Sequence, residues 1–351
     1  MATVSGTHPD KTSISAYRIT AVWALSESAL AGILHTLKIP LTGLIMASAA
    51  VLFIAMLHQF DPRKGAILKA TMLVLLVKAL VSPHIPLNAF VAVSFQGLAG
   101  EFIFNFLPRK KGAAVVLGII VLLQSALQKL LVLTIVFGKA LWTSIDLFGN
   151  FILSQAGLNF EGTGAPELSL WMIFAYTGLH LLAGIFAGIY AANLTNKIVR
   201  IHQSRELQNS ISLPKLSVSA QSAKNKKRRT KLIPYFIIAL ALTLYLLSYV
   251  FPILNQNGGL QAFLMILRSA AILLIWYFFL APLLRRLMQG FLSRRKNIYA
   301  DDLNRILSLL PLLRQLAVHS WNQLSKAGMF RRFLLFPEYF LVLLLGLNLS
   351  E

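Results

Sequence analysis

Residues 41–83, LTGLIMASAAVLFIAMLHQFDPRKGAILKATMLVLLVKALVSP, decide the fold class of this chain. Two long apolar runs lie on either side of the polar turn DPRKG. An α-helix rises about 1.5 Å per residue, so each run is long enough to cross the roughly 30 Å hydrocarbon core of a bilayer. The stretch therefore predicts two transmembrane helices joined by a tight basic turn.

The same pattern recurs along the whole chain. Of its 351 residues, 57% are hydrophobic and only 13% are charged, which is too few polar side chains to cover a soluble protein of this size. Nine membrane spans are expected, near residues 17–37, 39–57, 66–83, 88–106, 112–137, 169–192, 233–254, 261–283 and 333–349. The predicted fold class is an all-α polytopic membrane protein with a six-helix module and a three-helix module.

Basic residues are concentrated in every second connection between these spans. The connections after the second, fourth, sixth and eighth spans hold 25 of the 33 Lys and Arg residues. The positive-inside rule then predicts a cytoplasmic N-terminus. We expect a multi-pass protein of the plasma (inner) membrane, whose net charge of +21 reflects its cytoplasmic loops and not nucleic-acid binding.

A polar segment at residues 203–231, rich in Ser, Gln, Asn and Lys, divides the chain. Such a composition buries too little apolar surface to fold alone. Three parts are expected: a six-span substrate-binding module at 1–195, a basic flexible cytoplasmic linker at 196–232, and a second membrane module at 233–351.

The second module contains an amphipathic cytoplasmic helix pair at about 284–332, which Pro311 is expected to kink or split. This pair either lies on the membrane surface or offers a face to a partner. Three basic residues lie off its apolar stripe and are candidates for partner coupling: Arg305, Arg314 and Lys326.

Ionisable side chains inside predicted spans are the main functional candidates, because a charge at mid-bilayer costs about 2.5 to 3.5 kcal/mol. Glu27 and Lys78 lie at depths that allow pairing with Glu101 or the lining of a polar cavity. An internal ion pair that holds the bundle together is an equal alternative. Lys69, near the end of its span, is expected to snorkel without a further role.

Aromatic and polar residues toward the outer side suggest a binding site for a heterocyclic ligand. The candidate substrate-binding residues are Gln96, Glu101, Lys129, Trp142, Trp171, Tyr176 and His180. For His180 a packing role is an alternative. Small residues recur at every fourth position and predict close helix packing at Ala24, Ser28, Gly32, Gly184 and Gly188.

No catalytic signature occurs in the chain. It has no cysteine, no G-x-x-x-x-G-K-[ST] phosphate loop, no H-E-x-x-H, no G-x-S-x-G and no acidic cluster suited to Mg²⁺. We therefore predict no enzyme activity, no cofactor and no metal. A membrane enzyme that acts on a lipid has only the intramembrane Glu, Lys and His in its favour.

Three segments of the first half, KIPLTG (38–43), residues 41–72 and residues 82–104, resemble the substrate-binding S component of energy-coupling factor (ECF) vitamin transporters. The segment 302–330 is similar to the coupling helices of the transmembrane T component, although only Ser-Lys-Ala-Gly at 325–328 stands where an Ala-Arg-Gly type signature is expected. The resemblance implies a substrate site near the outer side, separate ATPase subunits and a transmembrane coupling subunit.

These observations lead to two functional hypotheses. The first is a transport subunit that captures a small organic nutrient, a vitamin or vitamin precursor, for import energised by separate ATPase subunits. The alternative is a non-transporting membrane scaffold, in which the basic linker and the amphipathic helix recruit a cytoplasmic partner or bind anionic lipid. Ligand binding distinguishes the two.

Overall fold

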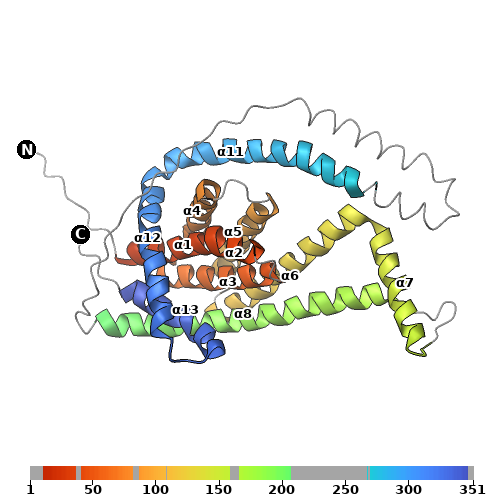
Figure 1. The fold of residues 1–351 in the computed structure, drawn as a ribbon. Coiled ribbons are helices and arrows are strands. Elements are labelled where there is room, and N and C mark those ends of the chain that lie inside the picture. Colours follow the sequence, from red (N-terminus) through yellow and green to blue (C-terminus); the bar gives the residue numbers. More distant parts are fainter. Residues whose placement is uncertain are drawn as a thin grey trace, which may run out of the picture. The chain divides into compact units, whose positions relative to one another are not determined.

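A computed structural model describes residues 11–36, 41–81, 87–107, 109–158, 166–206, 267 and 269–346 (Figure 1). These residues form α-helices and two π-helical turns, with no strand among them. Five helices are long and apolar enough to cross a membrane: Thr42–Phe60, Asn88–Phe106, Lys110–Phe137, Leu168–Ser204 and Ser269–Ile298. The chain is thus all-helical over the described ranges, with the helix length and hydropathy of a membrane protein.

The helices follow one another with short connections. In the first half they are α1 (Lys11–Leu25), the π-turn η1 (Ser26–Leu30), α2 (Ala31–Thr36), α3 (Thr42–Phe60), α4 (Ala66–Val81), α5 (Leu87–Phe106) and α6 (Lys110–Phe137). Then come α7 (Lys139–Gln155), α8 (Leu168–Glu206), the π-turn η4 (Trp276–Leu280), α11 (Ala281–Ile298), α12 (Ala300–Gln323) and α13 (Met329–Gly346).

The count of nine spans remains a prediction, and four of the predicted spans are not among the five long helices. The predicted span 17–37 falls on the helical stretch formed by α1, η1 and α2, and α4 has only 16 residues. α13 contains three charged side chains, at Arg331, Arg332 and Glu338. The predicted span 233–254 lies outside the described residues.

Several expected boundaries were wrong. α8 continues to Glu206, so the first part of the predicted 196–232 linker is helical, and the rest of it lies outside the described residues. The connection 138–168 between two predicted spans contains a further helix, α7. The helix expected to end at residue 283 continues to Ile298.

The amphipathic helix pair is present as α11 and α12, but the break between them lies at Tyr299. α12 passes through Pro311 without interruption.

Contacts between residues divide the chain into two units. Unit 1 contains residues 1–123, 181–221 and 292–351, and unit 2 contains residues 124–180 and 222–291. The C-terminal helices α12 and α13 therefore share a unit with α1 to α5, and α6 and α8 contribute to both units. These boundaries differ from the expected modules at 1–195 and 233–351.

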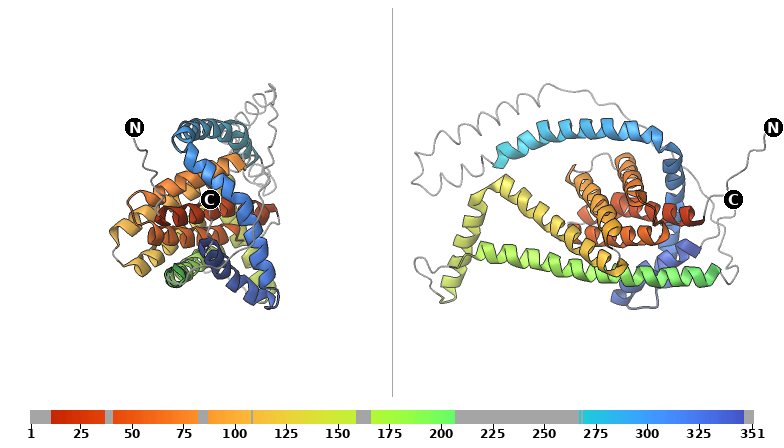
Figure 2. Two further views of the ribbon diagram at one scale, coloured as in Figure 1. Left: turned by 90° about the vertical axis from the view of Figure 1, so that its left-hand side faces the viewer. Right: turned by 180° about the vertical axis from the view of Figure 1, so that it is seen from behind.

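The core of unit 1 is formed by α1, α3, α4 and α5, which lie together in the views of Figures 1 and 2. Its largest fully buried apolar side chains include Trp23, Ile54, Leu57 and Leu73. Close van der Waals packing of such side chains, and not transfer from water, stabilises helix contacts within a membrane. Unit 1 holds most of the buried apolar side chains among the described residues and positions the candidate site.

Glycine permits close helix approach at the crossing of α6 and α8 in unit 1. A Cβ added to Gly184 would stand 2.7 Å from the carbonyl oxygen of Gly118, and one added to Gly188 would stand 2.6 Å from that of Ala114. Any larger side chain would push the two backbones apart. The predicted packing pair Gly184 and Gly188 thus lies directly on α6.

Candidate functional site

The candidate site is an ion pair between Glu27 on η1 and Lys78 on α4. Lys78 Nζ lies 2.6 Å from Glu27 Oε2, and the two side chains are only 2% and 5% exposed, respectively. The packed helices around them admit almost no water. Both residues were predicted as intramembrane charges, and the structure joins them to each other and not to Glu101.

The depth of this pair follows from the parallel course of α1 and α4. Tyr17 and Lys69 meet near the beginnings of the two helices. Glu27 lies ten residues beyond Tyr17, and Lys78 lies nine residues beyond Lys69. At about 1.5 Å per residue this is roughly 14 to 15 Å, half of the roughly 30 Å hydrocarbon core. The pair therefore lies about half a hydrocarbon thickness along the helices from the Tyr17–Lys69 contact.

The backbone around Glu27 departs from the regular α-helix. Residues Ser26–Leu30 form a π-turn, in which the repeat is wider than in an α-helix. The Ser26 hydroxyl donates to the Trp23 carbonyl at 2.8 Å, and the Ser28 hydroxyl donates to the Ala24 carbonyl at 2.6 Å. These bonds give the carbonyls partners where the ladder changes register. The sequence Ser-Glu-Ser thus stabilises the turn that carries the buried charge.

A second polar cluster lies where α12 meets α1 and α4. The Tyr17 hydroxyl donates to Asp302, and Lys69 Nζ lies 2.8 Å from Asp302 Oδ2 and donates to Tyr17 at 3.1 Å. The guanidinium of Arg305 lies 5.9 Å from the centre of the Tyr17 ring. The expectation that Lys69 has no further role was therefore wrong, since it anchors α12.

Arg18 adds a further connection to the C-terminal helices. Its Nη1 donates to the carbonyl oxygens of Leu344 and Leu345, at 3.2 and 3.4 Å, in the last turn of α13. Carbonyls at a helix C-terminus lack intrahelical partners and attract cations. Arg18 is buried, so these bonds satisfy part of its guanidinium. Sequence reasoning missed this residue and Tyr17.

A small cavity of about 70 Å³ lies beside the second polar cluster, between α1, the end of α3 and the beginning of α4. Its lining includes Tyr17, Thr20, Asp61, Lys69 and Leu73. Hydrogen bonding from the neighbouring Arg63 lowers the pKa of the Asp61 carboxyl below its ordinary value. Ligand pockets are typically about 300 to 1,000 Å³, so this cavity is too small for a nutrient.

The predicted substrate residues are divided between the two units. Gln96 and Glu101 belong to unit 1, and the other five belong to unit 2. Gln96 is buried at 4% exposure, and its side-chain oxygen has no hydrogen-bond partner among the described residues. Glu101 accepts hydrogen bonds from the Gly65 amide at 2.5 Å and from Asn105 at 2.7 Å. It therefore fixes the turn before α4.

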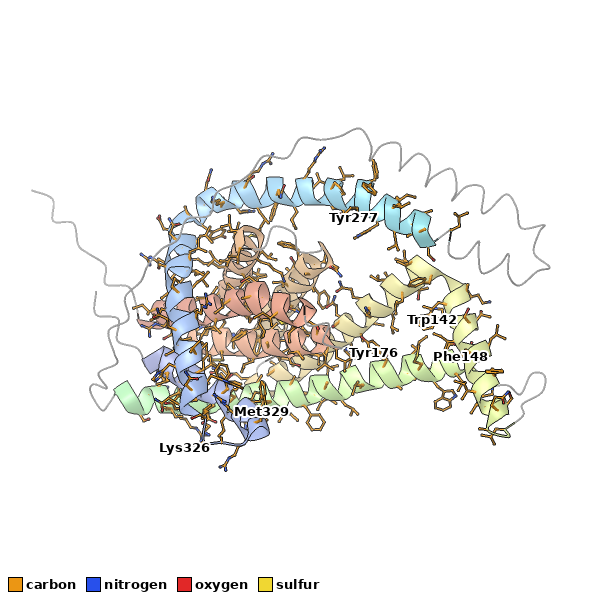
Figure 3. The ribbon with its side chains drawn as sticks, in the orientation of Figure 1. Trp142, Phe148, Tyr176, Tyr277, Lys326 and Met329 are labelled. Carbon is orange, nitrogen blue, oxygen red and sulfur yellow. The ribbon has the colours of Figure 1, made fainter. Side chains whose placement is uncertain are left out.

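In unit 2, Tyr176 and His180 lie together on one face of α8, with ring centroids 4.4 Å apart. His180 Nδ1 lies 2.9 Å from the Tyr176 carbonyl oxygen, as in a packed helix. Trp142 of α7 donates to Thr134 at 3.2 Å, and Figure 3 labels it with Tyr176. Trp171 and Lys129 are exposed. Among the five predicted substrate residues in unit 2, the structure brings Tyr176 and His180 into contact.

The remaining predicted residues, those for helix packing and partner coupling, differ in their burial within unit 1. Ala24 and Ser28 are buried, whereas a Cβ at Gly32 would meet no atom within 4 Å. Arg314 and Lys326 are exposed. Among the described residues, no group of three or more His, Asp and Glu side chains is placed to hold a metal ion.

Comparison with known proteins gives no relative: no protein-family model matches the chain, and no curated protein or solved structure matches it.

Proposed function

We propose that this chain is a membrane transport subunit that captures a small organic nutrient, such as a vitamin or vitamin precursor, for import energised by separate ATPase subunits. The observation that supports it best is the buried pair of Glu27 and Lys78. Ionisable groups at this depth commonly line substrate or ion pathways. The resemblance of the first half to ECF S components agrees with the same role.

The energetic cost of the pair argues for a role beyond packing. Two charges removed from water lose several kcal/mol of hydration each, and their attraction roughly restores it. Apolar side chains hold the neighbouring positions of α4 against the core without that cost, as Val74 and Val77 do. A chain that needed only adhesion between α1 and α4 gains nothing from Glu27 and Lys78.

Contact between a nutrient and this pair requires the helices around it to move apart, because both side chains are at most 5% exposed. The cavity of about 70 Å³ beside Tyr17 and Lys69 is too small for a vitamin. Glu27 lies in the π-turn of the first span, and π-turns inside α-helices frequently occur at functional sites. Separation of η1 from α4 exposes one carboxylate and one ammonium to the polar groups of a ligand. The outer residues predicted from sequence remain part of this proposal.

The scaffold alternative loses support from the position of α12. Its apolar stripe was expected to lie on the membrane or to recruit a partner. Instead Leu303, Ile306, Leu313 and Leu316 are at most 3% exposed. The stripe is therefore buried within unit 1, where α12 contacts α1, α4 and α13, and a partner that needs the stripe must displace α12.

The test is to purify the full chain from its native membrane and identify bound small molecules by mass spectrometry. We expect one organic compound in stoichiometric amount, absent from an unrelated membrane protein purified in parallel. Binding of that compound should then be reproduced with the purified chain. Repeated purification without a bound compound, together with no binding across a vitamin and precursor panel, would contradict nutrient capture.

A further inference from the structure

The hairpin of α12 and α13 carries a tip that unit 1 leaves uncovered. α12 runs across α1 and not along it in the views of Figures 1 and 2. The turn 324–328 follows, and Figure 3 shows Lys326 and Met329 at this outer end of the hairpin. The second half of α13 returns to the core, where Leu341 and Leu344 are buried.

The tip combines exposed apolar side chains with positive charge. Met329, Phe333 and Leu334 are 73%, 60% and 55% exposed. Lys326 and Arg331 are exposed beside them. No acidic residue occurs in the sequence between Asp302 and Glu338. A surface of this kind is complementary to an acidic lipid leaflet, which offers both hydrocarbon and negative headgroups.

Local contacts hold the tip in a defined shape. The guanidinium of Arg332 lies 4.0 Å from the Trp321 ring centre, and its Nε donates to the Trp321 carbonyl at 2.9 Å. The Phe333 ring packs edge-on against Trp321. Because Arg332 is bound in this way, it braces the turn, and Lys326 and Arg331 remain directed to the surroundings.

The middle of α13 contacts the second half of α8. Lys197 Nζ lies 2.6 Å from Glu338 Oε1 on α13. Lys197 stands near the end of Leu168–Ser204, a helix that is long and apolar enough to cross a membrane. Because basic residues concentrate where spans end, we expect the first turns of α13 and the preceding loop near the lipid headgroups.

We propose that the α12–α13 tip binds the acidic headgroups and upper acyl chains of the leaflet next to it. Met329, Phe333 and Leu334 enter the hydrocarbon boundary, while Lys326 and Arg331 contact phosphate groups. Each basic residue near an acidic leaflet contributes about a fivefold factor, so neutralising both lowers the equilibrium constant for docking roughly 30-fold. This binding is independent of the proposed transport function.

The test uses the absence of cysteine from the chain, which allows a single probe to be placed at one site. Met329→Cys carries an environment-sensitive fluorophore at the tip, and Gln315→Cys carries it on the exposed face of α12 as a matched control. Each full-length variant is placed in nanodiscs of phosphatidylcholine, with and without phosphatidylglycerol. Emission wavelength and quenching by neutral acrylamide are measured.

We expect the probe at residue 329 to shift to the blue and to be shielded from acrylamide only with phosphatidylglycerol. The additional changes Lys326→Gln and Arg331→Gln should abolish this shielding, and the probe at residue 315 should stay accessible throughout. Equal accessibility of residue 329 in both lipids would overturn the proposal. Shielding that appears only after a cytoplasmic protein is added would also overturn it and assign the tip to a protein partner.

Discussion

Removing the charges of Glu27 and Lys78 one at a time and together gives the sharpest prediction on stability. At 2.6 Å and an effective dielectric constant of about 20, their attraction is about 6 kcal/mol. Desolvation of several kcal/mol per ion offsets it, because both side chains are at most 5% exposed. The net contribution of the intact pair is therefore near zero, although either charge alone is costly.

Glu27→Gln and Lys78→Met should each destabilise the protein by about 3 to 5 kcal/mol, because each leaves one buried charge without a partner. The double variant should regain nearly all of that loss. The free energy of unfolding is measured in mixed micelles by titration with denaturing detergent, as a double-mutant cycle. Additive losses, or single variants that lose less than about 1 kcal/mol, would refute the reasoning and show that the two groups are solvated.

Two further predictions concern helix contacts. Gly184→Leu should destabilise the protein by about 1 to 3 kcal/mol, because the leucine side chain meets the backbone of α6, whereas Gly178→Leu, with open space at its Cβ, should be nearly neutral. Thermal unfolding of both variants measures the difference, and an equal loss of stability in the two would contradict the prediction. Asp302→Asn should raise the rate of hydrogen exchange in α12 about fivefold, because the partly exposed ion pair between Lys69 and Asp302 contributes about 1 kcal/mol. Asp301→Asn, at the exposed neighbouring residue, is the control. Equal exchange rates in the two variants would count against the anchoring role of Asp302.

Helical class and the buried charges could be predicted from sequence, but their pairing could not. Hydropathy places Glu27, Lys78 and Glu101 within apolar runs, and run position gives depth only. Partner choice depends on the rotation of each helix about its axis. The π-turn shifts that rotation at Glu27, and nothing in the apolar pattern indicates it.

The contact of α12 with α1 and α4 could not be predicted from the sequence either. Tyr17 and Asp302 are 285 residues apart in sequence, and no local pattern connects them. The apolar stripe of α12 predicted an amphipathic helix, because Leu303, Ile306 and Leu313 recur at helical spacing. A stripe shows that a face will be buried, whereas its partner is decided by the tertiary fold.

α7 was missed for a different reason. Gly138 and Gly157 border the segment, both with positive φ, and such glycines are typical of turns. The segment also contains Asp146 and Asn150, which interrupt its hydropathy. The structure uses Asp146 to accept from the Ser169 amide at 2.6 Å at the start of α8. Asp146 is therefore polar because it caps the neighbouring helix α8, although in sequence it looks like a loop residue.

The central claim is that Glu27 and Lys78 serve ligand capture and not only packing. Its most direct test is the affinity of the copurified nutrient for the native chain and for the folded Glu27→Gln, Lys78→Met double variant. Because the double variant keeps its stability, a change in affinity reports on the site itself. We predict at least about tenfold weaker binding, equivalent to about 1.4 kcal/mol. An unchanged dissociation constant in the folded double variant would contradict the claim and make the pair a packing element.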